Sequence, residues 1–304
     1  MFTYKLRPVL VSAWGLILLL ILTGCVRSEP ALETPSVSPE NQKTETPLIP
    51  SATTLPMAVL VNGEGVLLTD YQFELSRLQQ ALVETGQSME PDEQKEAVLS
   101  MLIDSSLLAQ EAKKSGFTLE DDAVQTRLDE LAVSLGGSAA LIDWMNTYGY
   151  DDASLLRSLK LQMLATKGKD IVTAIVGDSA DQVHARQIRT SDEAAANSYL
   201  DRLQAGTDFA TIADEVDALT GGDLGWFPKG YLLHDELNEV VFTLEPGEYS
   251  QVIKTQIGYH IIQVIERDEN HPLNSETRLF LQHQVLENWL KEQRENAEIE
   301  ILVP

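Results

Sequence analysis

The spacing of apolar residues changes once along the chain, and this change separates two kinds of predicted structure. From about residue 69 to 176, apolar side chains recur every three or four positions, which predicts consecutive amphipathic helices. Five stretches show this spacing, at Tyr71, Leu75, Leu78 and Leu82, at Val98, Met101, Leu102, Leu108 and Ala112, at Val124, Leu128, Leu131 and Leu135, at Leu141, Trp144, Met145 and Tyr148, and at Leu155, Leu159 and Met163. A short strand and turn over 57–68 precede them, and Thr69 to Gln72 fits a capping box for the first helix.

Beyond about residue 180 the segments become shorter and mixed in type. We expect strands and helices in the order strand, helix, helix, loop, helix, strand, strand, at 183–190, 191–206 with Ser191 as N-cap, 208–216, 234–244, 249–255 and 258–268. This order predicts a small α+β domain.

An amphipathic helix returns after Pro272, and a strand-like segment, "EIEILV", closes the chain at 298–303. Leu279, Leu286 and Leu290 share one face of that helix. A lone terminal helix cannot bury such a face. We therefore expect it to pack against the helical region before residue 180, which makes the α+β domain an insertion. Packing on the α+β domain is the alternative.

The N-terminus has the pattern of a targeting segment. Lys5 and Arg7 precede an apolar run, "VLVSAWGLILLLIL", which has signal-peptide length and is short for a membrane span. The run ends in Leu-Thr-Gly-Cys, which resembles the lipobox of bacterial lipoproteins. This resemblance implies removal of residues 1–24 and diacylglycerol attachment to Cys25; a plain signal anchor is the alternative. Residues 25–56 are then the acylated Cys and a disordered tether, because Pro, Ser and Thr dominate 26–56 without any apolar period.

Charge and cysteine content exclude several classes of function. Lys and Arg number 22 against 47 Asp and Glu, a formal charge of −25, which argues against a nucleic-acid partner. The single Cys cannot form an intramolecular disulfide, a CxxC pair or a thiolate zinc cluster. The five His residues lack HExxH spacing, and no GxSxG nucleophile elbow occurs. We therefore expect no metal and no cofactor, and we disfavour a hydrolase or metalloenzyme.

Three dense motifs carry a family resemblance. They are "RLQAGTDFATIA" (202–213), "GGDLGWFPKG" (221–230) and "VVFTLEPGEYSQVIKTQIGYHIIQV" (240–264), in the order and near the spacing found in parvulin-type peptidyl-prolyl isomerases. With the lipobox and the helical region, the whole chain resembles PrsA/SurA-type foldases. The resemblance implies an α+β parvulin domain at 181–268, inserted in a mostly α-helical chaperone domain made of 57–180 and 269–304.

The same motifs imply three residues at the reacting bond. Thr255 and His260 match the Thr and His of the family's T-x-x-G-x-H turn. Gln187 stands where parvulins usually carry a second His on the first strand. His184 lies three residues earlier, on the opposite strand face, so it is a poor substitute. If the alignment is correct, Gln187 and His260 lie on neighbouring strands, and the glutamine amide can keep the hydrogen bond of an imidazole.

The resemblance also implies an apolar cup for the proline ring. Its matched positions are Leu224, Leu233, Leu237, Phe242 and Trp226. Leu232 is an alternative to Leu233, packing alone is the alternative for Phe242, and a core or rim position is the alternative for Trp226. Asp217 is the nearest acidic candidate in a loop shorter than the family's, with a solvated loop charge as the alternative.

A site of this kind needs no cofactor. Rotation about a peptide bond has an uncatalysed barrier of ~18–20 kcal/mol, and a site lowers it by fitting the twisted amide better than the planar one. The sequence therefore predicts a lipid-anchored prolyl isomerase on the extracytoplasmic side of the cell membrane. Its partners would be unfolded or nascent secreted polypeptides with Xaa-Pro bonds. The alternative is a chaperone of the same architecture with a weak or inactive isomerase site.

Overall fold

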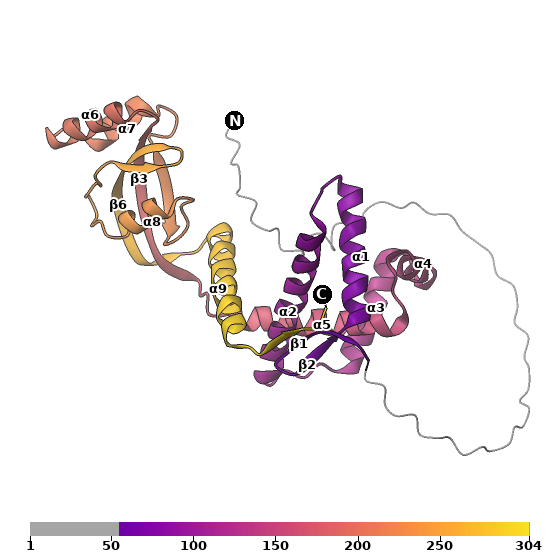
Figure 1. Cartoon of the computed structure of the whole chain (residues 1–304). Coiled ribbons are helices and arrows are strands. Elements are labelled where there is room, and N and C mark those ends of the chain that lie inside the picture. The colour runs from indigo at the N-terminus through magenta and orange to yellow at the C-terminus, as the bar shows by residue number, and fades with distance from the viewer. Residues whose placement is uncertain (1–54, 304) are drawn as a thin grey trace, which may run out of the picture. The chain divides into compact units, whose positions relative to one another are not determined.

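The computed structural model describes residues 55–303, which form two compact units (Figure 1). The first unit contains the described residues up to Asp170 together with those from Leu290 onward, and the second contains Ile171–Trp289. The predicted signal peptide, Cys25 and nearly all of the predicted tether lie outside the described residues.

The first unit is built mainly of helices around a small sheet. Its helices are α1 (Leu68–Thr85), α2 (Pro91–Lys114), α3 (Asp121–Leu135), α4 (Ser138–Tyr148) and most of α5 (Asp152–Thr173), and its strands are β1 (Met57–Val61), β2 (Glu64–Leu67) and β7 (Ile299–Ile301). One buried cluster joins β1, α1 and α2 through Ala58, Tyr71, Val98 and Leu102. A second cluster joins α3, α4 and α5.

Helix ends follow local chemistry, and one predicted cap is wrong. Helix α2 begins at Pro91, which suits a first helical turn, and Glu90 and Glu93 form a capping box there. Helix α1 begins at Leu68 rather than after Thr69, and no side chain caps it. The backbone N–H of Leu68 donates to the carbonyl of Pro56 (2.9 Å), so the residue before β1 pairs the first N–H of the helix.

The last strand of the chain pairs with the first described strand. The sheet order is β2-β1-β7, and both pairs are antiparallel. Arg294, near the end of α9 (Ser275–Asn296), also donates to Asp104 on α2 at 2.6 Å. The end of the chain is thus part of the first unit.

The second unit is a four-stranded antiparallel sheet between helices. Its elements are β3 (Ser179–Thr190), α6 (Glu193–Gln204), α7 (Phe209–Val216), β4 (Asp223–Pro228), α8 (Asp235–Val241), β5 (Ile253–Thr255), β6 (Gly258–Pro272) and the first part of α9, and the sheet order is β4-β3-β6-β5. Helices α6 and α7 pack on one face of the sheet (Figure 1). Helix α8 packs on the other face.

Three details of this unit correct the sequence-based elements. Asp192, not Ser191, caps α6, because its side chain accepts from the Ala194 N–H. The segment expected as a loop forms strand β4, since pairing with β3 outweighs the low strand propensity of its Gly and Pro. Strands β3 and β6 run longer than expected, because their pairing continues to Ser179 and Pro272.

The second unit is also longer than the domain expected at 181–268. Tyr231 donates to Glu276 (2.7 Å) and its ring meets Phe280 edge-on at 5.2 Å between centroids. Arg278 donates to the Gly177 carbonyl (2.6 Å). These contacts bring the first turns of α9 into the second unit. Leu279, expected on the buried stripe, is 66% exposed.

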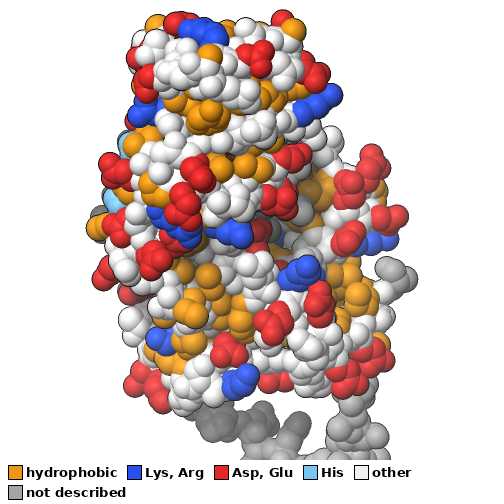
Figure 2. Space-filling model, turned by 90° about the vertical axis from the view of Figure 1, so that its left-hand side faces the viewer, with side chains coloured by type: hydrophobic (Ala, Val, Ile, Leu, Met, Phe, Trp, Pro, Cys, Tyr) orange, Lys and Arg blue, Asp and Glu red, His pale blue; other side chains and the backbone are white. Residues whose placement is uncertain are grey.

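Carboxylates are spread over the surface rather than gathered in one patch on the face shown in Figure 2. Within residues 55–303, no helix combines the length and the apolar character needed to cross a membrane.

Candidate active site on the central strands

The two central strands of the second unit bring one polar pair onto an apolar sheet face. Along β3 and β6, Gln187 lies opposite Ile262, and Arg189 lies opposite His260. Side chains two residues apart share a strand face. Gln187 and His260 are therefore diagonal neighbours on the face that α8 covers.

A line of hydrogen bonds connects three of the predicted site residues. Thr255 Oγ1 lies 2.9 Å from His260 Nε2, and His260 Nδ1 lies 3.0 Å from Gln187 Oε1. An amide oxygen only accepts hydrogen bonds, so Nδ1 carries the imidazole proton and Nε2 accepts from the Thr255 hydroxyl. The hydrogen bond expected between Gln187 and His260 is present.

The turn between β5 and β6 holds Thr255 in place. Its hydroxyl accepts from the Ile257 N–H (3.2 Å) and also lies 3.2 Å from the Gly258 carbonyl. Gly258 has φ +131°, and a Cβ there would lie 2.4 Å from the Thr190 carbonyl oxygen. The turn therefore needs Gly at this position.

His260 is neutral at physiological pH. Its side chain lies in a residue that is only 1% exposed. Burial first, and then the nearby Arg189 guanidinium and His234 imidazole, lower the pKa of His260 to about 4. The imidazole is thus a fixed hydrogen-bonding group and not a proton donor at pH 7.

The amide nitrogen of Gln187 is the outer end of the line. It has no hydrogen-bond partner among residues 55–303, and it is not among the buried unpaired atoms of that part of the chain. Both N–H groups of this amide are consequently available to a bound molecule. Gly222 fixes the backbone there, because the Gln187 N–H donates to the Gly222 carbonyl (2.8 Å).

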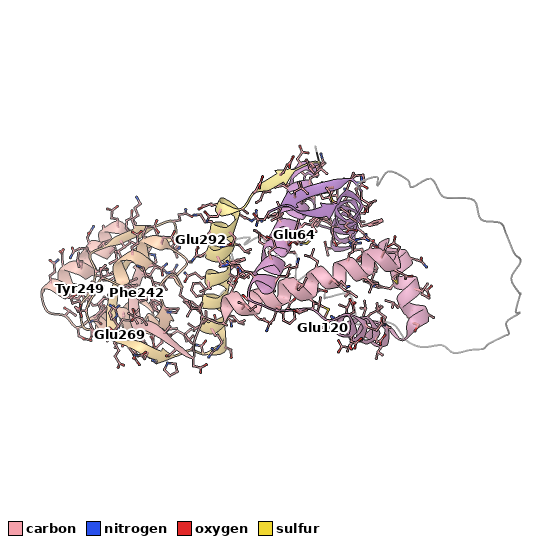
Figure 3. The ribbon with its side chains drawn as sticks, turned by 90° about the horizontal axis from the view of Figure 1, so that it is seen from below. Glu64, Glu120, Phe242, Tyr249, Glu269 and Glu292 are labelled. Carbon is pink, nitrogen blue, oxygen red and sulfur yellow. The ribbon has the colours of Figure 1, made fainter. Side chains whose placement is uncertain are left out.

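Apolar side chains continue the same sheet face beside the polar line. The buried cluster contains Val183, Ala185, Phe227, Leu237, Val241, Ile262 and Val264. Leu224, Leu232 and Phe242 pack against it and remain partly exposed. We call these three residues and Leu237 the apolar cup. Figure 3 shows Phe242 within this unit, where its ring meets Phe227 edge-on at 6.3 Å.

The structure separates the two leucines that the alignment left open. Leu232 packs on the cluster, and its N–H and carbonyl bond the buried side chain of Asn238 at 3.0 and 2.6 Å. Leu233 is 56% exposed and precedes α8, so Leu232, the alternative, is the residue that packs beside Leu237. Asn238, which no motif identified, fixes Leu232 by forming hydrogen bonds with both its N–H and its carbonyl.

Trp226 does not lie at the apolar cup. It is opposite His184 in the register of β3 and β4, one residue from Phe227, and so occupies the other sheet face. Its ring stacks on His271 at 4.0 Å and on His184 at 5.6 Å. The prediction of Trp226 as a substrate-binding residue is corrected on this ground, and the core or rim alternative fits its position.

Two other polar candidates are occupied elsewhere. Asp217 accepts from the Leu219 and Thr220 N–H groups and from the Thr220 hydroxyl (2.6 Å), so it closes its own loop. These hydrogen bonds, the Thr220 hydroxyl first, lower the pKa of Asp217. His184 lies 2.8 Å from Asp223, on the face opposite His260.

His234 is a neighbour of the site that sequence reasoning missed. It precedes α8, and its ring centroid lies 6.4 Å from that of His260. Its Nε2 atom is buried without a hydrogen-bond partner among the described residues. A lone His before a short helix matches no motif, so the sequence carried no signal for it.

Comparisons with known proteins agree with this geometry. The model of the PPIC-type PPIase domain matches residues 158–268, and that of the SurA-like N-terminal domain matches residues 51–135. Foldase protein PrsA of Caldanaerobacter subterraneus is 32% identical over 224 residues, covering 68% of this chain and 72% of that protein. Foldase protein PrsA of Halalkalibacterium halodurans is 30% identical and covers 58% of this chain and 59% of that protein.

Two further similarities cover other shares of the chain. Chaperone SurA of Nitrosococcus oceani is 36% identical over 112 residues, 33% of this chain and 26% of that protein. The crystal structure of the peptidylprolyl isomerase PrsA from Bacillus cereus aligns with a TM-score of 0.47 at 20% identity, covering 82% of this chain and 94% of that chain.

The family resemblance read from the three motifs is confirmed. The sheet with its polar line, the match to the PPIC-type domain and the match over 72% of a PrsA protein agree. The chain belongs to the PrsA family of foldases, and its second unit is a parvulin-type peptidyl-prolyl isomerase domain.

Proposed function

We propose that this chain is a lipid-anchored foldase on the extracytoplasmic side of a cell membrane. It isomerises Xaa-Pro bonds in unfolded secreted polypeptides at the line Thr255–His260–Gln187 and the apolar cup. The observation that carries the site assignment is the 3.0 Å contact between His260 Nδ1 and Gln187 Oε1, since it turns the Gln187 N–H groups outward.

The chemistry requires only binding and positioning. The cup takes the proline ring, and the amide of Gln187 donates to the prolyl peptide group as its resonance is lost. Neutral His260 does not transfer a proton. It fixes the orientation of Gln187 through Nδ1, and Thr255 fixes His260 through Nε2.

The replacement of the usual first-strand His by Gln is tested by kinetics on one Xaa-Pro peptide. Gln187→His should retain or raise kcat/KM, because an imidazole can form the same contact. Leu237→Ala should lower kcat/KM about 10- to 100-fold, because it removes apolar contact with the ring. Leu237→Met keeps the volume and serves as the matched control.

A chaperone with an inactive isomerase site is the competing function, and the match to a SurA-like N-terminal domain favours testing it. If wild type, Gln187→His and Leu237→Ala all give the uncatalysed rate while the protein still suppresses aggregation of an unfolded client, the chaperone function stands alone. Circular dichroism of each variant excludes unfolding as the cause.

Membrane attachment is tested at Cys25, which ends the predicted lipobox. The full chain, expressed in a bacterium with labelled fatty acid, should carry label that Cys25→Ser loses. Equal label in both proteins would contradict lipid anchoring. Two acyl chains are expected, because one chain alone gives only marginal membrane binding.

A further inference from the structure

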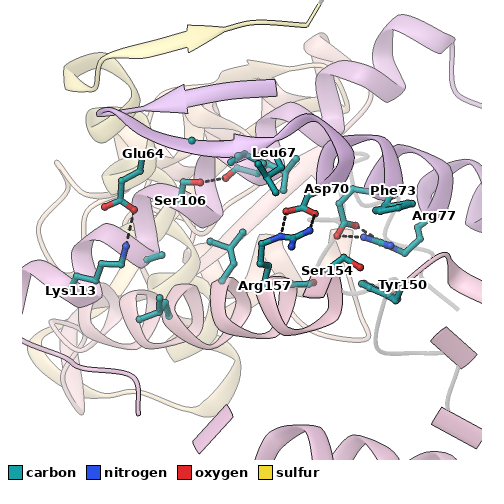
Figure 4. Close-up of a pocket in the computed structure, with 18 residues that line it drawn as sticks. Glu64, Leu67, Asp70, Phe73, Arg77, Ser106, Lys113, Tyr150, Ser154 and Arg157 are labelled. Carbon is teal, nitrogen blue, oxygen red and sulfur yellow. Dashed lines mark hydrogen bonds and ion pairs between the residues drawn. The ribbon is translucent and has the colours of Figure 1, made fainter. Parts of the chain in front are cut away.

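A pocket of about 250 Å³ lies in the first unit, between the edge of β2 and helix α5 (Figure 4). All four residues of β2 line one side of it, and residues of α1, α2 and α5 line the others. Its floor is apolar, with Leu102 and Ala109 of α2 buried and Leu161 and Leu164 of α5 half-buried. This pocket has no part in the isomerase site, which lies in the second unit.

The hydrogen-bond pattern of β1 shows which way the backbone of β2 points. The Asn62 N–H donates to the Glu298 carbonyl, and the Leu302 N–H donates to the Ala58 carbonyl, each at 2.8 Å. Even-numbered residues of β1 therefore use their backbone groups on the C-terminal segment. Leu60 belongs to this set, so it does not bond Gly65, its partner across the hairpin.

The N–H and carbonyl of Gly65 consequently point away from β1. The close pair beside the two-residue turn, Val61 with Glu64, fixes the same alternation independently. Figure 4 shows that this outer edge of β2 faces the pocket, with α5 on the far side. Gly65 is exposed, and within residues 55–303 no partner is found for these two backbone groups.

The charged side chains around the pocket neutralise one another. Arg157 donates to both oxygens of Asp70 at 2.8 and 2.6 Å. Lys113 lies 2.7 Å from Glu64, the hairpin residue that is labelled in Figure 3, and Arg77 lies 2.5 Å from Glu74. The three cations are thus paired with three carboxylates, and the pocket offers no free charge to a phosphate or a carboxylate ligand.

What remains unpaired is one backbone donor and one backbone acceptor beside an apolar hollow. A polypeptide in extended conformation can pair with both the N–H and the carbonyl of Gly65, because it presents an N–H and a carbonyl on one edge and side chains on its faces. Four residues of such a chain match the length of β2, about 13 Å at 3.3 Å per residue.

We propose that the free edge of β2 accepts an extended segment of an unfolded polypeptide as an added strand, with one apolar side chain in the pocket. Recognition is by backbone pairing at Gly65 and burial against α2 and α5, so it does not require proline. The chain then has a second polypeptide site that is independent of the isomerase site.

The proposal is tested with one peptide and its modified copy. The probe is a fluorescein-labelled, proline-free peptide of seven residues with alternating Val or Leu and Thr. The copy carries N-methyl groups at alternate residues, which remove the N–H donors of one edge and keep every side chain. In fluorescence anisotropy with the full chain, the copy should bind at least about tenfold more weakly, as expected for loss of backbone pairing.

Two substitutions at Gly65 form a matched pair. Gly65→Pro removes the outward N–H without breaking a bond to β1, and Gly65→Ala keeps it. Both introduce a Cβ, which would lie 2.7 Å from the flexible Met57 Sδ, so any cost of that atom is shared. Gly65→Pro should weaken binding about tenfold, and Gly65→Ala should bind within about twofold of wild type.

The outcomes separate this proposal from the isomerase. The kcat/KM for isomerisation of a short Xaa-Pro peptide should be equal in wild type and both Gly65 variants. Peptide binding at β2 is measured separately, so it can be tested even if the chain has no isomerase activity. Equal binding of the two peptides, no binding to wild type, or equal binding by Gly65→Pro overturns the proposal. A concentration-dependent dimer in sedimentation that Gly65→Pro abolishes would assign the edge to a second copy and overturn it as well.

Discussion

Burial of a neutral imidazole makes the second unit sensitive to mild acid. The pKa of His260 is lowered to about 4 by burial first, and by Arg189 and His234 after it. An unfolded His titrates near 6.5. Above pH 6.5 His260 is neutral in both the folded and the unfolded chain, so its low pKa does not reduce the free energy of unfolding. As the pH falls from 6.5 toward 4, the unfolded chain binds the proton and the folded chain does not, so stability is lost across this window.

The size of this loss follows from the two pKa values. At pH 5 most unfolded molecules carry the proton and about a tenth of the folded ones do, which gives a loss of about 2 kcal/mol relative to pH 8. With a urea dependence near 2 kcal/mol per molar, the unfolding midpoint should fall by about 1 M. His260→Gln cannot be protonated, so it should lack this part of the shift.

Two measurements check the reasoning. The imidazole C–H signal of His260 is identified as the one that His260→Gln lacks. In an NMR titration of the full wild-type chain, the chemical shift of this signal should stay constant between pH 8 and 5. Urea unfolding of the second unit is monitored at pH 8 and at pH 5 by hydrogen exchange in peptides from β3 and β6. The free energy of unfolding should fall more between these pH values in wild type than in His260→Gln. A titration midpoint near 6.5, or equal losses in wild type and His260→Gln, would refute it. Because the same group stays neutral, isomerase activity should also be flat between pH 5 and 8.

Three further predictions follow from contacts already described. On one Xaa-Pro peptide, Trp226→Leu should leave kcat/KM within about twofold of wild type, whereas Leu224→Ala should lower it severalfold. A larger loss in Trp226→Leu than in Leu224→Ala would show that Trp226 belongs to the apolar cup. Gly222→Ala should destabilise the second unit by about 1–3 kcal/mol and lower activity, because the new Cβ would lie 1.9 Å from the Gln187 carbonyl oxygen at φ +69°. Gly206→Ala, also at positive φ but with nothing within 4 Å, is its control in urea unfolding. Deleting residues 297–304 should destabilise the first unit by more than about 3 kcal/mol. The three bonds that join Glu298 and Leu302 to Ala58 and Asn62 contribute about 1 kcal/mol each, and the pairing of Leu60 with Glu300 is lost as well. Glu300→Ala keeps the backbone bonds and should have little effect, so equal thermal unfolding of both variants would count against this prediction.

The sequence was most informative where a residue's role depends on its immediate neighbours. The spacing of apolar side chains located the five helices α1 to α5, and the T-x-x-G-x-H turn placed Thr255 and His260 together. The polar contact of Gln187 with His260 also followed from strand alternation once the motifs had aligned the two strands.

It was least informative where a distant partner decides the outcome. Pairing with β3 makes β4 a strand despite its Gly and Pro, and the same register turns Trp226 away from the cup. One residue of alignment slack was enough to exchange Leu233 for Leu232, because Asn238 fixes that segment through contacts with no sequence pattern. The edge of β2 became visible only once β7 was seen to occupy the backbone groups of Leu60.

The pairing of β1 with β7 also sets an order of events during synthesis. The two strands are separated by more than two hundred residues, so Ile299 to Ile301 leave the ribosome long after Met57 to Val61. The second unit, which closes over a much shorter stretch of chain, can form before them, since domains fold as they emerge. Until β7 has been synthesised, the sheet of the first unit lacks its third strand. A chain stalled before Ile299 would thus carry a folded second unit beside an incomplete first one, so the pairing of β7 with β1 is a late step in the folding of the first unit.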